Sequence, residues 1–154
     1  MGIPTLVKTA AGVTAAAAAG SVATRPGSTW YRSLDKPAWQ PPAAAFPIVW
    51  TSLYALIAIA AARTLKRLPP AERRRFWRTY VTNLALNAGW TGVFFAARRP
   101  GLALVEIAAL NSSNVALLRQ AWRTDRLAGV ALLPYVAWTG FATVLNGSIA
   151  ARNR

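Results

Sequence analysis

The stretch LAGVALLPYVAWTGFATVLNGSIAA, residues 127–151, has no charged side chain. As a helix it is long enough to cross the hydrocarbon core of a bilayer, which is about 30 Å thick and needs roughly 20 helical residues. Residues 37–62 and 79–97 are also uncharged, and residues 100–118 are interrupted only by Glu106. The sequence therefore predicts a membrane protein whose spans are helices, since these runs lack the alternation of a barrel strand.

A fifth apolar run, residues 9–24, is too short to cross a bilayer as it stands. It becomes long enough as residues 3–24 if Lys8 lies near the membrane surface and extends its ammonium group outward. The competing interpretation is a signal peptide, because Ser21-Val22-Ala23 resembles a small-residue cleavage pattern. Counted as a span, the run completes a single domain, residues 1–154, with an all-α fold, a bundle of five transmembrane helices. The predicted spans are about 3–24, 43–65, 79–97, 100–118 and 127–150, with a loop at 25–42.

Basic residues lie between these runs. The chain is 55% hydrophobic and 14% charged, with a formal net charge of +14. Because the charges bracket the spans and do not form one basic face, we expect no nucleic-acid partner. Segment 63–78 carries seven basic residues against Glu72, and its Pro69-Pro70 pair predicts a short surface helix. One side of the five-span topology holds eleven Lys and Arg against seven on the other, which predicts a cytoplasmic N-terminus and contacts with anionic lipid.

Few residues offer acid–base or metal chemistry. The chain has no cysteine and no histidine, so thiolate chemistry and cysteine or histidine metal sites are excluded, and we expect no metal. Of the four acidic residues only Glu106 falls inside a predicted span. An intramembrane acid suggests function, but Glu106 is close enough along the helix to Arg99 for a structural ion pair, and a snorkelling carboxylate is a further interpretation.

Polar and aromatic residues recur along one face of the third predicted span. Asn83 and Asn87 are four residues apart, and Trp90 continues the stripe. The amides either join the third and fifth spans or face a cavity. Trp50, Trp90 and Trp138 lie within spans, where they either pack or line a cavity for a flat apolar molecule. The same four-residue spacing recurs in the fifth span at Trp138, Ala142 and Asn146.

Four motifs in order resemble the translocator protein family, TspO, also called the peripheral benzodiazepine receptor. They are WY..L.KP.W.PP from Trp30, F..VW..LY from Phe46, NLALN..WT..FF from Asn83 and LLPY.AWT.FAT.LN from Leu132. The resemblance implies a five-helix bundle, commonly a homodimer, whose cavity binds porphyrins such as protoporphyrin IX, isoquinolines, benzodiazepines and, in some members, cholesterol. It implies a tetrapyrrole ligand and no separate cofactor.

The same resemblance implies roles for individual residues. Some bacterial relatives degrade protoporphyrin in light, and the two tryptophans linked to that activity match Trp50 and Trp138. The loop at 25–42 matches a lid over the cavity, and its prolines and aromatics reduce the entropy lost when a loop orders over a ligand. The motif positions expected at or near the ligand are Tyr31, Trp39, Asn87, Trp90, Tyr135 and Ala142.

The chain also departs from its mammalian relatives. Leu102 replaces a cavity tryptophan, and Ala44 follows the proline pair where an aromatic is frequent, so benzodiazepine-type affinity is not implied. Residues 144–152 have no tyrosine, so the short sterol motif is absent.

The residues and the family resemblance together leave three functions open. The first is a porphyrin-binding protein of a bacterial cytoplasmic membrane that regulates or disposes of tetrapyrroles, with light-dependent oxidation as a candidate activity. The second is a carrier of porphyrins, sterols or other apolar molecules that uses Glu106 for proton coupling. The third is a ligand-regulated receptor without turnover.

Overall fold

The protein is described by a computed structural model that covers residues 4–154; residue 3, where the first predicted span begins, lies outside the described part. Within these residues all regular structure is helical. The elements are α1 (Thr5–Ala23), α2 (Thr29–Ser33), α3 (Ala45–Arg67), α4 (Pro70–Thr91), the π-helical turn η1 (Gly92–Ala96), α5 (Pro100–Thr124) and α6 (Arg126–Arg152).

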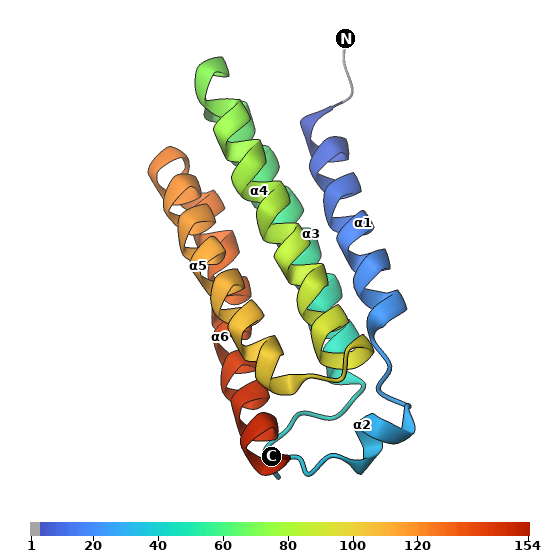
Figure 1. The fold of residues 1–154 in the computed structure, drawn as a ribbon. Helices are drawn as coiled ribbons and strands as arrows, with labels where there is room; N and C mark the ends of the chain where they lie inside the picture. Colours follow the sequence, from blue (N-terminus) through green and yellow to red (C-terminus); the bar gives the residue numbers. More distant parts are fainter. Residues whose placement is uncertain (1–3) are drawn as a thin grey trace.

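The five long helices run side by side, and α2 lies across one end of the bundle (Figure 1). The end of α6 lies at the same end as α2, whereas the start of α1 lies at the opposite end (Figure 1). The most extensive packing joins α5 to α6, and α1 packs against α3 and α4. Because α3 also packs against α6, the five long helices form a closed ring. The loop that contains α2 lies across one end of this ring (Figure 1).

Four helices are long and apolar enough to cross a membrane, namely α1, α3, α5 and α6. Helix α4 differs because it opens with Glu72 and a cluster of arginines, and its uncharged stretch, residues 79–97, continues through η1. The expected short surface helix is therefore wrong as a separate element. It forms the first two turns of α4, because nothing after Pro70 interrupts the helical hydrogen bonds.

Local sequence determines where these helices begin. Pro70 and Pro100 occupy the first turns of α4 and α5, where a missing backbone N–H is tolerated. The Ser28 side chain caps α2 by accepting a hydrogen bond from the Tyr31 N–H at 3.2 Å. Asp125 caps α6 by accepting from the Leu127 N–H at 3.0 Å. These caps satisfy amides that helix starts leave unpaired.

Candidate functional site

A central cavity lies between the lid, residues 25–42, and helices α1, α3, α4 and α6. Its volume is about 490 Å³, which suits a small-molecule site. Gln40 and Asn87 are among the few polar side chains on its wall. The aromatic lining consists of Tyr31, Phe46, Trp50, Tyr54, Trp90, Phe94, Phe95, Trp138 and Phe141. Such a wall favours a flat, largely apolar ligand.

Trp50 on α3 and Trp138 on α6 both line the central cavity. The ring centroid of Trp50 lies 5.4 Å from that of Tyr54. The Trp90 Nε1–H donates a hydrogen bond to Asn146 Oδ1 at 2.9 Å, whereas within residues 4–154 neither Trp50 nor Trp138 donates one. Within the described residues the indole N–H groups of Trp50 and Trp138 thus have no hydrogen-bond partner, whereas that of Trp90 is paired.

A chain of hydrogen bonds runs from the cavity wall into the bundle. The Tyr54 O–H donates to Asn87 Oδ1 at 2.8 Å, and Asn87 Nδ2–H donates to the Tyr135 hydroxyl at 3.0 Å. The Tyr135 O–H donates to Asn83 Oδ1 at 2.9 Å, and Asn83 Nδ2–H donates to Asn114 Oδ1 at 2.6 Å. The prediction that amides join the third and fifth spans is thus confirmed, with Tyr135 as their shared partner on α6. Asn87 also lines the cavity.

The predicted ligand residues do not all reach the cavity. Tyr31, Asn87, Trp90 and Ala142 line it together with the two tryptophans described above. Tyr135 is fully buried behind the wall, with its ring centroid 6.3 Å from that of Trp50. Trp39 lies outside the lining: its side chain is 49% exposed, and its ring packs edge-on against Phe141. Neither of these two residues therefore forms part of the cavity wall.

Two other lid residues contact Tyr31, which itself belongs to the lid and packs against Phe94 and Phe95 of η1. Gln40 Nε2–H donates to the Tyr31 hydroxyl at 3.0 Å, and Lys36 Nζ lies 4.6 Å from the centroid of the Tyr31 ring. Burial raises the pKa of the Tyr31 phenol, and the hydrogen bond from Gln40 offsets part of that rise. Tyr31 is therefore a neutral phenol at neutral pH.

Sequence reasoning missed several lining residues. Phe46 and Tyr54 flank Trp50 at four-residue spacing, so the helical repeat of the F..VW..LY motif was a signal that all three share one face. Gln40 gave no comparable signal, because its position in a loop has no periodicity. Its Oε1 atom is buried and has no hydrogen-bond partner within residues 4–154.

Glu106 lies away from the cavity. It is on α5 and is not among the lining residues. The expected ion pair with Arg99 is wrong, because within the described residues Glu106 makes no salt bridge. Its Oε1 instead faces Gly89 of α4, where an added Cβ would lie 3.1 Å away. No group of three or more potential metal ligands occurs between residues 4 and 154.

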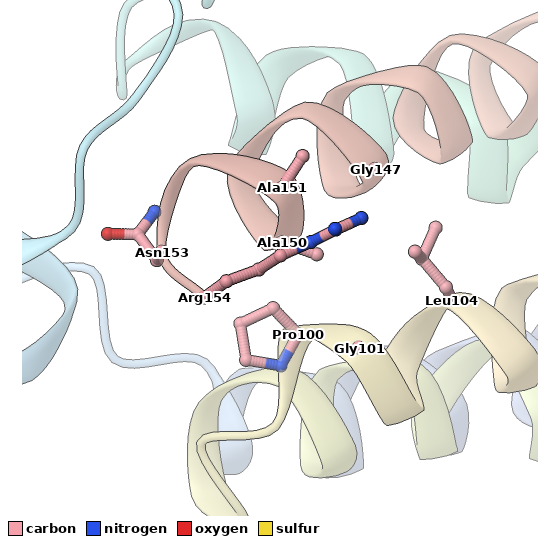
Figure 2. Close-up of a pocket in the computed structure, with 8 residues that line it drawn as sticks. All are labelled: Pro100, Gly101, Leu104, Gly147, Ala150, Ala151, Asn153 and Arg154. Atoms are coloured by element: carbon pink, nitrogen blue, oxygen red, sulfur yellow. The ribbon is translucent and has the colours of Figure 1, made fainter.

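A second hollow of about 360 Å³ separates the start of α5 from the end of α6 (Figure 2). Small residues line most of it, and the Arg154 side chain extends along it toward Leu104 (Figure 2). It contains no aromatic side chain, so the central cavity is the better candidate site.

The fold and the site define an all-helical membrane protein with an aromatic cavity closed by a proline-rich loop. The chain belongs to the TspO/MBR family, which matches residues 8–152.

Curated relatives agree with this assignment. The chain is 38% identical to a tryptophan-rich sensory protein of Cereibacter sphaeroides over 117 residues, 76% of this chain and 72% of the relative. It is 36% identical to the protein CrtK of Rhodobacter capsulatus, over 78% of this chain and 76% of that protein. It is 34% identical to the human translocator protein, over 78% of this chain and 72% of the human one.

Proposed function

We propose that this chain is a tetrapyrrole-binding protein that holds protoporphyrin IX, or a related tetrapyrrole, in the central cavity and regulates or disposes of it. The observation that carries the proposal is the pair Trp50 and Trp138. They lie on the neighbouring helices α3 and α6, line one aromatic cavity, and have indole N–H groups without a hydrogen-bond partner within residues 4–154. A porphyrin is flat and largely apolar with polar edges, and stacking on indole rings suits that shape.

Light-dependent oxidation is the disposal reaction within this proposal. An indole beside a photoexcited porphyrin can donate an electron to it. Dioxygen, the oxidant in this proposal, then adds to the porphyrin radical, and the oxygenated porphyrin returns the electron to the indole radical. Trp50 and Trp138 are better placed for this role than Trp90, because the Trp90 N–H is engaged by Asn146. The cavity would hold the porphyrin against both indoles while the lid limits access of water.

The proposal includes five membrane spans, with α4 and η1 forming the third in sequence. The uncharged residues 79–97 come close to the length that a span needs. The arginines that open α4 would then lie at the membrane surface. The start of α1 lies at that same end of the bundle (Figure 1), and the positive-inside rule makes it the cytoplasmic end of a bacterial cytoplasmic membrane.

A titration of protoporphyrin IX into the detergent-solubilised protein tests the proposal. Binding is measured by quenching of tryptophan fluorescence, and turnover by the porphyrin absorption spectrum under illumination. The variants are Trp50→Phe, Trp138→Phe and the double change. Trp77→Phe is the matched control, because Trp77 lies on α4 outside the cavity lining.

Saturable binding is expected for all four variants, and light-dependent loss of porphyrin is expected only where Trp50 and Trp138 remain. Binding without any loss would leave the receptor function. Absence of binding in the unaltered protein would refute the tetrapyrrole proposal.

A further inference from the structure

A pair of hydrogen bonds joins the lid to the residue that follows α6. The two partners, Asp35 and Asn153, lie 118 positions apart in the sequence. The Asp35 backbone N–H donates to Asn153 Oδ1 at 2.9 Å, and Asn153 Nδ2–H donates to the Asp35 carbonyl oxygen, also at 2.9 Å. Asn153 Nδ2–H additionally donates to the Ile149 carbonyl oxygen at 2.8 Å, which fixes the amide on the last turn of α6. One side chain thus satisfies both backbone groups of one lid residue. We call this contact the α6 latch.

In the α6 latch the Asn153 side chain bonds to the backbone of Asp35 and not to its carboxylate. The Asp35 carboxylate lies 3.7 Å from Arg152, in an exposed ion pair of the kind that contributes little to stability. By contrast, the paired backbone bonds fix the position and direction of the chain at Asp35. The lid position therefore depends on Asn153 far more than on the charge of Asp35.

The latch connects directly to the cavity wall. Lys36 follows Asp35, and its ammonium group lies over the ring of Tyr31, a cavity-lining residue. Gln40, further along the lid, donates to the Tyr31 hydroxyl. Release of Asp35 would free the lid segment from Asp35 to Gln40, and Tyr31 would then be held mainly by its packing against Phe94 and Phe95.

We propose that Asn153 is a positioning residue that keeps the lid closed and so sets the rate at which a ligand enters and leaves the central cavity. The consequence for the ligand rests on the proposed binding function. A gate of this kind changes both rates in the same direction, because entry and exit use the same opening.

The test compares Asn153→Ala with two neighbouring changes. Asp35→Ala removes the ion pair but leaves both backbone hydrogen bonds. Arg154→Ala alters the next residue, whose side chain lies in the groove of Figure 2 and makes no hydrogen bond within the described residues. Because all three sites are at the surface, each variant is expected to fold.

The first readout needs no ligand. Hydrogen exchange of the Asp35 amide reports opening of the latch directly. Two exposed hydrogen bonds, each at the low end of its usual contribution of about 0.5 kcal/mol, are lost in Asn153→Ala, so exchange is expected to be roughly fivefold faster. Asp35→Ala and Arg154→Ala should leave exchange across the lid within about twofold of the parent. Equal exchange in Asn153→Ala and the parent would overturn the latch.

The second readout is stopped-flow quenching with protoporphyrin IX. Association and dissociation rates are both expected to rise roughly fivefold in Asn153→Ala, so that Kd changes by less than about threefold. Faster lid exchange with unchanged ligand rates would overturn the gating role. If protoporphyrin IX binds to none of the proteins, the binding proposal fails, and amide exchange alone decides whether Asn153 holds the lid.

Discussion

Removing one hydroxyl by Tyr135→Phe should destabilise the bundle more than any other single-atom change near the cavity. The Tyr135 hydroxyl donates to Asn83 Oδ1 and accepts from Asn87 Nδ2–H. Both amide side chains are buried, with relative exposures of 0% and 4%. The change therefore leaves one acceptor and one donor without a partner where water cannot replace them.

The size of the loss follows from these two atoms. A buried polar atom without a partner costs about 1–3 kcal/mol, and hydrogen bonds within membranes average nearer to about 0.6 kcal/mol. Taking about 1 kcal/mol for each atom gives a loss of about 2 kcal/mol in the free energy of unfolding. For a chain of this size that corresponds to a fall in Tm of roughly 4–8 °C.

Tyr54→Phe is the matched control, since it deletes the same atom one step along the same chain of hydrogen bonds. Its loss leaves one atom unpaired, Asn87 Oδ1, where Tyr135→Phe leaves two. A smaller loss is expected, about 1 kcal/mol. Thermal unfolding of both variants in the same detergent decides the matter: if Tyr135→Phe lowers Tm no more than Tyr54→Phe does, the buried chain of hydrogen bonds does not stabilise the bundle as argued.

Three other predictions concern positions outside the cavity. Gly129→Ala should lower Tm although alanine is the better helix former. The new Cβ would lie 2.3 Å from Trp122 Cε3 and 3.0 Å from Trp122 Cα, which is too close. An unchanged or higher Tm would contradict this prediction. Desolvation tends to raise the pKa of Asp125, but hydrogen bonds and charge from Arg63, the Leu127 N–H and the charge of Arg67 outweigh it and lower the pKa. The stability that Asp125 contributes is thus complete above its unfolded pKa of about 3.9 and is lost as pH falls through the lower folded value. Asp125→Asn should therefore flatten the acid side of a plot of Tm against pH. A parallel shift of Tm at all pH values would contradict this assignment. Glu106→Gln should leave the Kd for protoporphyrin IX unchanged, because Glu106 does not line the cavity; loss of proton-linked porphyrin flux in vesicles would instead support the carrier function.

The sequence located the helices well because their causes are local. Uncharged runs, proline pairs and capping residues act within a few positions of one another, and α3, α5 and α6 begin within two residues of the predicted spans. The separate surface helix was wrong because a change from charged to uncharged composition does not end a helix. Only a broken hydrogen bond or a steric clash does so, and α4 contains neither between its arginines and Asn83.

The candidate site also has a part that local sequence could indicate and a part that it could not. Four ordered motifs indicated the family, whereas the four-residue spacing of Phe46, Trp50 and Tyr54 was a signal of a shared helical face that went unused. Spacing could not show that Trp39 packs outside the cavity or that Glu106 faces Gly89 and not Arg99. Both depend on how helices rotate against one another, and composition does not encode that rotation.

By itself the sequence determined that this chain is a helical membrane protein of the TspO/MBR family, because bilayer thickness and the cost of unpaired backbone groups leave few alternatives for long uncharged runs. Only the tertiary structure decided which polar atoms are paired. It joined Asn83 and Asn87 to Tyr135 and brought Asn153 to the backbone of Asp35. It also left the N–H groups of Trp50 and Trp138 without a partner among residues 4–154. These contacts link residues dozens of positions apart, and they form because packing of the whole bundle brings complementary groups within hydrogen-bond distance.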